Sequence, residues 1–209
     1  MTRGKFLTIE GQDGAGKSTN IAVMRDYLES QNIEFIQTRE PGGTQFGEKV
    51  RELILNSDDE LIGNKAELLL MFAARAQHIE TIIEPALHSG RWVLCDRFTD
   101  ASYAYQGAGR GIDTKDIELL EKYTQQGLTP DLTLVLDLPT EVGESRAGGR
   151  SAPDRFEQQK LDFKQRVRDC YLQRARKDPT RMKVVDASQT LEIVKASVMA
   201  QMQEFGARV

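Results

Sequence analysis

Short apolar runs alternate along the chain with longer amphipathic stretches. The apolar runs are rich in β-branched and aromatic residues and predict five strands, at Lys5–Glu10, Ile33–Thr38, Trp92–Asp96, Leu132–Asp137 and Met182–Asp186. Between them, apolar residues recur three and four positions apart, as in an amphipathic helix; the first such set is Ile21, Met24, Tyr27 and Leu28. This alternation predicts an α/β fold, a parallel five-stranded sheet with helices on both faces.

The segment from residue 147 to residue 154 differs in composition from its surroundings. It reads Ala-Gly-Gly-Arg-Ser-Ala-Pro-Asp and interrupts two helical patterns, which is typical of a mobile lid rather than of a core element. No internal repeat or low-complexity linker divides the chain. We therefore expect a single domain over residues 1–209, with a small mobile lid at about residues 146–157.

Residues 11–18 match the phosphate-binding pattern G-x-x-x-x-G-K-[ST] in full, between a predicted strand and a predicted helix. Glycines let backbone N–H groups surround phosphate oxygens, and the helix N-terminus adds the positive end of its dipole. Lys17 supplies a charge for the β- and γ-phosphates, and the Ser18 hydroxyl can bind Mg²⁺. The pattern predicts a P-loop NTPase fold and an ATP site formed by Gly11, Gln12, Asp13, Gly14, Ala15, Gly16, Lys17, Ser18 and Thr19.

The rest of the chain favours a small-molecule kinase among P-loop proteins. A GTPase needs a guanine-reading Asn-Lys-x-Asp motif, and the nearest segment here, residues 64–67, reads Asn-Lys-Ala-Glu and begins a predicted helix. Motor and transporter ATPases are usually larger than 209 residues.

Three arginines indicate a second anion site. Arg39 lies at the end of a predicted strand and Arg97 directly follows another, so both should point into the crevice at the carboxyl ends of the strands. Arginine is suited to gripping a phosphate through two parallel hydrogen bonds. Arg51, one helix further on, is a weaker candidate. For each of them, a surface salt bridge is the alternative interpretation.

Other side chains near this crevice are candidate ligand contacts. Asp96 ends an apolar strand, where P-loop enzymes place an acid near Mg²⁺, although a turn or helix-cap role is also open. Phe72 and Arg75 share one face of a predicted helix and could stack on a base and hydrogen-bond its carbonyl oxygen; Phe72 could equally belong to the core. The polar segment 99–107 predicts a short helix, on which Ser102 and Tyr105 could line one wall.

Composition and charge limit the partners. Hydrophobic residues make up 39% of the chain, the net charge is −4, and no long basic run is present, which argues against nucleic-acid binding. No apolar run approaches the ~20 residues that span a membrane. The two cysteines, Cys95 and Cys170, form no CxxC pair, and the chain enters a strand almost at once. These features predict a cytoplasmic protein.

Taken together, the motifs resemble those of the thymidylate kinases over most of the chain. The Arg-Glu-Pro-Gly-Gly segment and the Asp-Arg-Phe segment with its downstream Tyr-Gln-Gly are specific to that family, whereas the P-loop alone is not. The resemblance implies transfer of the γ-phosphate of ATP to dTMP in dTTP synthesis, with Mg²⁺, by a homodimer. Its motifs occupy residues 9–19, 38–44, 96–107, 154–157 and 185–188.

The resemblance also implies residue roles. Asp13 would accept a hydrogen bond from the 3′-hydroxyl of dTMP, and Arg97 and Arg39 would hold its phosphate. Tyr105 would lie under the sugar at C2′ and disfavour ribonucleotides. The base would be contacted by Phe72 through stacking, by Arg75 at O4, and by Ser102 at the N3 edge with Gln106 nearby.

Family members differ in the source of one catalytic arginine. Some carry it in the P-loop, at the position of Gly14 here, so this chain resembles the branch, common in bacteria, that carries it in the lid. The lid holds Arg146 and Arg150. We expect Arg150 to act in catalysis with Lys17 and Arg97, and Arg146 to contact ATP; the two roles could be reversed.

Three alternatives stay open at this point. Other nucleoside monophosphate kinases lack the Arg-Glu-Pro-Gly-Gly segment. A deoxynucleoside kinase would use a carboxylate base, for which Glu10 could serve, but the two acceptor-side arginines would then have no phosphate to hold. A non-catalytic nucleotide-binding regulator is disfavoured by the intact Lys17, Ser18 and lid arginines.

Overall fold

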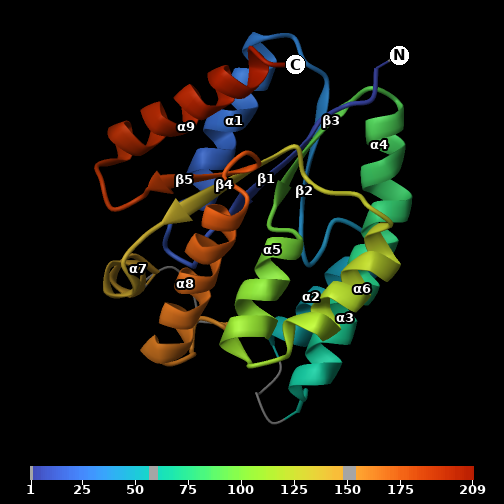
Figure 1. Cartoon of the computed structure of the whole chain (residues 1–209), viewed down its shortest axis with the longest axis vertical. Coiled ribbons are helices and arrows are strands. Elements are labelled where there is room, and N and C mark those ends of the chain that lie inside the picture. Colours follow the sequence, from blue (N-terminus) through green and yellow to red (C-terminus); the bar gives the residue numbers. More distant parts are fainter. Residues whose placement is uncertain (1, 57–60, 148–153) are drawn as a thin grey trace.

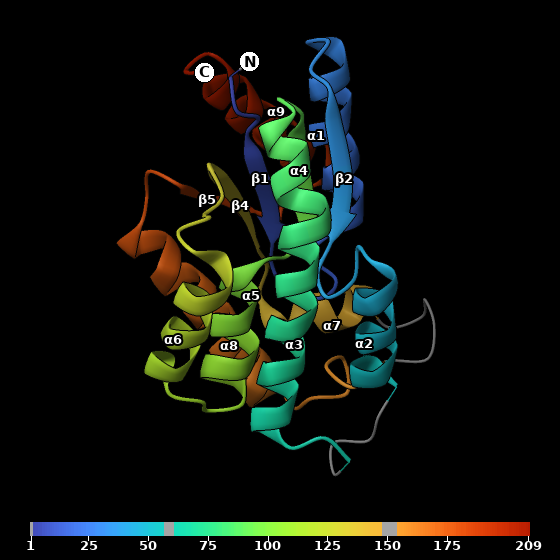
Figure 2. The same cartoon turned by 90° about the vertical axis from the view of Figure 1, so that its right-hand side faces the viewer.

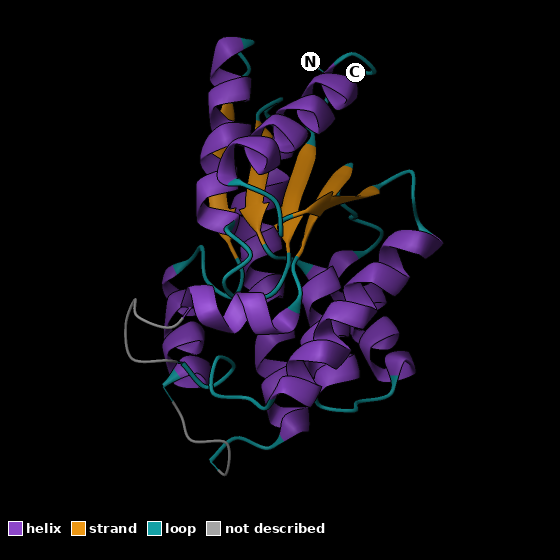
Figure 3. Ribbon diagram, turned by 90° about the vertical axis from the view of Figure 1, so that its left-hand side faces the viewer, coloured by secondary structure: helices purple, strands orange, loops and turns teal. Residues whose placement is uncertain are grey.

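The computed structural model describes residues 2–56, 61–147 and 154–209, with the backbone alone at residue 147. Five strands form one parallel sheet in the order β2-β3-β1-β4-β5, which confirms the predicted architecture. Figure 3 shows this sheet packed between layers of helix. The strands are β1 (Phe6–Glu10), β2 (Phe35–Arg39), β3 (Trp92–Asp96), β4 (Leu132–Asp137) and β5 (Met182–Asp186).

Helices make the crossovers between the parallel strands. A π-helix, η1, joins α3 to α4 in one continuous rod (Figure 2), and a second, η2, extends α5. The polar segment that follows Arg97 is helical, as predicted. The Asn-Lys-Ala-Glu segment at residues 64–67 begins a helix, also as predicted. The helices are α1 (Lys17–Ser30), α2 (Gln45–Leu55), α3 (Asn64–His78), η1 (Ile79–Ile83), α4 (Glu84–His88), α5 (Thr99–Ser102), η2 (Tyr103–Gly109), α6 (Thr114–Gln125), α7 (Thr140–Ala147), α8 (Leu161–Lys177) and α9 (Leu191–Gly206).

Both faces of the sheet are covered, because successive side chains of a strand point to opposite faces. In β1, Leu7 and Ile9 pack against α1 and α9, which lie side by side (Figure 1), while Phe6 packs against η1 and α4 on the other face. Helices α5, η2 and α8 cover the β4 side of that second face. No helix within the described ranges is long and apolar enough to cross a membrane.

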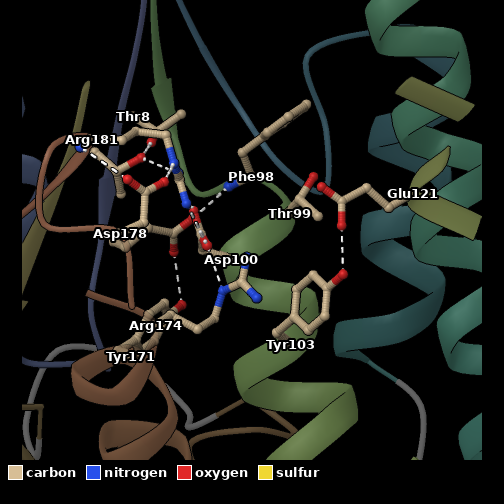
Figure 4. A network of polar contacts seen from close by, with 12 residues as sticks. Thr8, Phe98, Thr99, Asp100, Tyr103, Glu121, Tyr171, Arg174, Asp178 and Arg181 are labelled. Atoms are coloured by element: carbon tan, nitrogen blue, oxygen red, sulfur yellow. Dashed lines mark hydrogen bonds and ion pairs between the residues drawn. The ribbon is translucent and has the colours of Figure 1, made fainter. Parts of the chain in front are cut away.

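A buried carboxylate ties α5 to α8 and to the start of β5 (Figure 4). Asp100 accepts from Arg174 Nε at 2.6 Å and from Arg181 Nη1 at 2.7 Å, and Arg181 also donates to Thr133 in β4. Burial by itself raises the pKa of Asp100, but Arg181 and Arg174 outweigh burial and leave this pKa below its usual value. The cluster holds α8 against α5 and against the amino end of β5.

Replacing Arg181 tests this cluster. Arg181→Met keeps the length of the side chain but removes its hydrogen bonds to Asp100, and we expect a loss of about 2 kcal/mol in the free energy of unfolding in urea. The control is Arg25→Met on α1, whose pairs with Asp26 and Glu29 are exposed. That change should stay within about 0.5 kcal/mol. Equal losses in the two variants would show that the cluster adds nothing to stability.

Candidate active site

The P-loop connects the end of β1 to the first turn of α1. Lys17 Nζ donates to the backbone carbonyls of Gly11 at 3.1 Å and Gln12 at 3.2 Å, which holds the side chain back across the loop. Gly14 has φ +79°, and a Cβ atom there would lie 2.3 Å from the carbonyl oxygen of Gly143 in α7. Only glycine fits this position, because both the backbone conformation and the available space exclude a side chain.

Two charged groups of the loop influence each other. Asp13 Oδ1 lies 3.7 Å from Lys17 Nζ and 2.9 Å from Arg97 Nη2. Burial alone raises the pKa of Asp13, yet Arg97 and Lys17 outweigh it and lower that pKa overall. Burial, together with the charge of Arg97, lowers the pKa of Lys17. The site therefore brings two cations and one anion together at the mouth of the loop.

Arg97 joins the P-loop to the helical face beside it. Its backbone has φ +68°, an uncommon conformation for a residue other than glycine, which is frequent at functional sites. Its Nη1 donates to the carbonyl of Gly11 at 2.8 Å, and the guanidinium lies 4.8 Å from the centre of the Tyr105 ring. This places the side chain between the P-loop and η2, as its position after a strand predicts.

Two cavities meet around Arg97. The first has a volume of about 300 Å³ and contains the P-loop. The second is about 70 Å³, smaller than the ~300 Å³ of typical small-molecule pockets, so a nucleotide must displace side chains to enter it. The first is lined by Asp13, Gly14, Gly16, Lys17, Ser18, Thr19, Arg39, Glu40, Arg51, Asp96, Arg97 and Glu157. The second is lined by Asp13, Glu40, Pro41, Arg51, Leu55, Met71, Arg97, Ala101, Tyr105, Gln106, Asp154 and Phe156.

The three candidate acceptor-side arginines lie at these cavities. Arg39, at the end of β2, is half-exposed and donates to Glu48 at 2.7 Å. Arg51, on α2, donates to the carbonyl of Pro41 at 3.1 Å and lines both cavities, as Arg97 does. The structure thus brings together Arg39, Arg51 and Arg97 from three separate elements.

Ser18 and Asp96 line the first cavity and fit a hard divalent cation. Asp96 Oδ1 is buried, and within the described ranges it has no hydrogen-bond partner. Those ranges contain no cluster of three His, Cys, Asp or Glu side chains that could hold a metal. Mg²⁺ commonly takes one or two protein oxygens and completes its shell with phosphates and water, so these residues suit a metal that arrives with a nucleotide.

Glu40 organises the layer behind the second cavity. It is buried, and it accepts from Arg75 Nε at 2.7 Å and from His78 Nδ1 at 2.9 Å. Because a carboxylate only accepts, Nδ1 of His78 carries the proton of that hydrogen bond. The second ring nitrogen, Nε2, lies 2.6 Å from the Thr38 hydroxyl. A Cβ atom on Gly43 would lie 2.5 Å from that ring nitrogen. The Arg-Glu-Pro-Gly-Gly segment is therefore shaped around this buried hydrogen-bond chain.

The candidate base contacts lie next to this layer. Arg75 is buried, its guanidinium lies 4.6 Å from the centre of the Phe72 ring, and its Nη2 donates to Ser102 at 3.0 Å. Tyr105 and Gln106 line the second cavity, whereas Phe72, Arg75 and Ser102 do not. Phe72 packs instead among buried apolar side chains. Its stacking on a base stays a prediction.

Comparisons with known proteins agree with these features. Residues 9–198 match the family model for thymidylate kinase. The chain belongs to the thymidylate kinase family. It is 55% identical over 192 residues to the thymidylate kinase of Vesicomyosocius okutanii, covering 92% of this chain and 94% of the relative. It is 52% identical to the thymidylate kinase of Chromohalobacter salexigens, covering 98% of this chain and 97% of the relative. A solved thymidylate kinase from Ehrlichia chaffeensis superposes with a TM-score of 0.79 at 31% identity, covering 96% of this chain and all of that one.

The structure describes only part of the segment predicted to be a lid, residues 146–157, in this member of the thymidylate kinase family. Arg146 donates from Nη1 to the carbonyl of Ala187 at 2.8 Å, which brings it to the late Val-Asp-Ala-Ser segment. Arg150 lies outside the described residues. Beyond that gap, Asp154 and Phe156 line the second cavity and Glu157 lines the first.

The sequence pattern does not indicate Tyr171 as part of the site. Tyr171 donates to Glu10 at 2.7 Å and lies 3.3 Å from Arg97 Nη1, although in the sequence it is one apolar position of helix α8. Glu10 also accepts from the backbone N–H of Phe98 at 2.7 Å. Burial, helped by the charge of Asp100, raises the pKa of Glu10 to about 7. No local pattern in the sequence indicates these contacts, because α8 and β1 are far apart along the chain.

The shifted pKa of Glu10 makes stability depend on pH. Its folded pKa of about 7 exceeds its unfolded value of 4.5, so the folded state binds the extra proton and becomes less stable as pH rises through that window. Glu10→Gln cannot release that proton. From pH 5 to pH 8, wild type should therefore lose on the order of 2–3 kcal/mol of unfolding free energy relative to the variant. Urea unfolding at each pH measures this, and two parallel curves would contradict the assignment.

Proposed function

We propose that this chain transfers the γ-phosphate of ATP to dTMP, giving dTDP and ADP, with the residue roles set out below. Family membership carries this reaction. The observation that carries the roles is that the P-loop cavity and the second cavity share four lining residues: Asp13, Glu40, Arg51 and Arg97. A donor phosphate in one cavity and an acceptor phosphate in the other would meet at this shared wall.

Positioning and charge neutralisation are the main tasks in phosphoryl transfer. Lys17 would hold the β- and γ-phosphates, since it lines the cavity that contains the P-loop. Arg97 would bind the acceptor phosphate and the transferring group, since Gly11, Asp13 and Tyr105 restrain its guanidinium. The remaining P-loop backbone would bind ATP. Arg39 and Arg51 would complete the grip on the acceptor phosphate.

Mg²⁺ would be held by Ser18 and Asp96, with the nucleotide phosphates as its other ligands. When bound, it would neutralise charge on the β- and γ-phosphates. Asp96 Oδ1 supports this assignment, because it is buried and has no hydrogen-bond partner among the described residues.

The sugar and base of dTMP would occupy the second cavity and the space beside it. Asp13 would accept from the 3′-hydroxyl, and Tyr105 would lie against C2′ and disfavour ribonucleotides. Arg75 would donate to O4, with Ser102 and Gln106 at the N3 edge and Phe72 against the ring. The small volume of this cavity, about 70 Å³, implies that side chains around it move when the base enters.

The catalytic arginine outside the acceptor site would come from the lid. A side chain at residue 14 would collide with the backbone of α7, which supports the branch of the family without an arginine in the P-loop. Arg150 would then stabilise the transferring phosphoryl group. Arg146 would contact ATP.

We further propose that the enzyme is a cytoplasmic homodimer. The neighbouring helices α3 and α6 expose Leu69, Leu119 and Tyr123, which are 57%, 68% and 80% accessible, and exposed apolar side chains of this kind are common at subunit interfaces. Both cysteines are free thiols, which suits a reducing compartment.

An acceptor panel tests the reaction. With ATP and Mg²⁺, ADP release should be fast with dTMP, and kcat/KM should fall about 100-fold or more with UMP, because the 2′-hydroxyl meets Tyr105. The panel also includes dUMP, dCMP, AMP, GMP and free thymidine. Preferred turnover of thymidine would instead indicate a deoxynucleoside kinase, and no turnover with tight ATP binding would indicate a regulator.

Single alanine variants test the two lid arginines. Arg150→Ala should lower kcat on the order of 10³-fold, by analogy with other arginines that stabilise a transferring phosphoryl group. Arg146→Ala should mainly raise the KM for ATP. Steady-state kinetics at saturating dTMP separate the two effects. If Arg146→Ala loses kcat while Arg150→Ala keeps it, the two roles are reversed.

A further inference from the structure

Glu67, on α3, is a fully buried carboxylate next to the second cavity. Its Oε2 lies 3.2 Å from Arg110 Nη2 and 3.2 Å from Arg155 Nη2, and its Oε1 lies 2.9 Å from the side-chain amide nitrogen of Gln106. The two guanidinium groups balance its charge. One carboxylate oxygen thus faces the arginines, and the other faces Gln106.

This contact sets the orientation of the Gln106 amide. A carboxylate can only accept hydrogen bonds, so the amide must turn its NH₂ group toward Glu67. The reversed amide would set two oxygens against each other. The Gln106 oxygen is therefore left over: it is buried, and it has no hydrogen-bond partner in the described part of the chain. Gln106 lines the second cavity, so this oxygen is the polar atom it can offer to a ligand.

A second buried atom of the opposite kind lies nearby. Arg75 Nη1, a donor, is likewise buried without a partner in residues 2–56, 61–147 and 154–209. Arg75 donates a hydrogen bond from Nη2 to Ser102, and Ser102 lies four positions before Gln106 on the same helical segment. A donor and an acceptor that both lack partners thus lie at one end of the acceptor site. Buried polar atoms of this kind are costly unless a ligand meets them.

The pair matches one edge of a pyrimidine base. Thymine presents the O4 acceptor beside the N3–H donor, whereas cytosine presents an N4 donor beside an N3 acceptor. Ser102 cannot make this distinction alone, because a hydroxyl rotates to donate or to accept. An amide whose NH₂ is bound to a buried carboxylate has a fixed polarity.

We propose that Glu67 is a positioning residue that fixes the Gln106 amide with its oxygen toward the acceptor base, and thereby selects N3–H bases over cytosine. The inference rests on the proposed function, since it takes the occupant of the second cavity to be a pyrimidine nucleotide. Glu67 itself acts through Gln106 and touches no substrate.

Glu67→Gln tests this by reversing the polarity with little change in shape. The amide oxygen of the new side chain would face the two arginines, so its NH₂ would face Gln106. Gln106 would then turn its own oxygen to residue 67 and its NH₂ to the base. We expect the ratio of kcat/KM for dTMP over dCMP to fall about tenfold or more. The ratio for dTMP over dUMP should stay unchanged, because both bases carry the same O4 and N3–H edge.

A control variant completes this test. The control is Glu192→Gln, an exposed position on α9, across the sheet from the acceptor site. It should leave both ratios unchanged. If Glu67→Gln lowers activity equally with all three acceptors, Glu67 is only structural and the proposal is overturned. If wild type itself fails to phosphorylate dTMP, the proposed function fails first, which is a separate outcome.

Wild-type protein supplies a second measurement, which decides the matter if Glu67→Gln does not fold. The side-chain amide resonance of Gln106 can be identified by its loss in Gln106→Met. Bound to Glu67, its NH₂ protons should exchange slowly with solvent both without and with dTMP. Rapid exchange in the free enzyme would show that Glu67 does not hold the NH₂ group, and it would overturn the proposal.

Discussion

The ion pair between Arg97 and Asp13 joins the two halves of the site. Asp13 belongs to the P-loop and Arg97 to the turn after β3, and the parallel pairing of β1 with β3 brings the ends of these strands together. The same guanidinium binds the Gly11 carbonyl and lies over the Tyr105 ring. Donor and acceptor sites are therefore aligned by a contact that exists only when the sheet has its correct strand order.

A layer of buried charge supports that contact. Glu10 and Tyr171 lie behind Arg97, and Asp100 with its two arginines holds α8 in place behind them. Replacing a whole buried ion pair with apolar side chains often costs little stability, whereas removing one partner alone is costly, so the presence of such pairs is weak evidence for stabilisation. In this protein they connect β1, α5 and α8, elements whose mutual position determines where the Arg97 guanidinium lies. Their contribution is better understood as geometry than as binding energy.

The sequence predicts what depends on local pattern. The P-loop, the five strands and the arginines at strand ends follow from glycine spacing and from apolar runs, because those features arise within about ten neighbouring residues. The buried partners do not. Glu40, Glu67 and Tyr171 occupy ordinary positions, a loop acid and two helix residues, and their roles arise from contacts across 35 or more positions, as between Arg75 and Glu40. The spacing of Phe72 suits base stacking, its ring packs among buried apolar side chains, and its contact with a base stays a prediction.

The polar atoms that lack partners give a different kind of information from the motifs. Most buried polar groups in proteins are hydrogen-bonded, so an unmatched one at a cavity is a place where a ligand can complete the set. Among the described residues, such atoms include Asp96 Oδ1 at the carboxyl end of β3, Arg75 Nη1 on α3 and Gln106 Oε1 on η2, which packs against α3. The neighbours of Arg75 and Gln106 are carboxylates that already have partners, Glu40 and Glu67. Arg75 and Gln106 each keep one buried atom of defined donor or acceptor character that has no partner in the described part of the chain. Specificity would then follow from which hydrogen bonds the protein has already made, rather than from the identity of the side chain that touches the ligand.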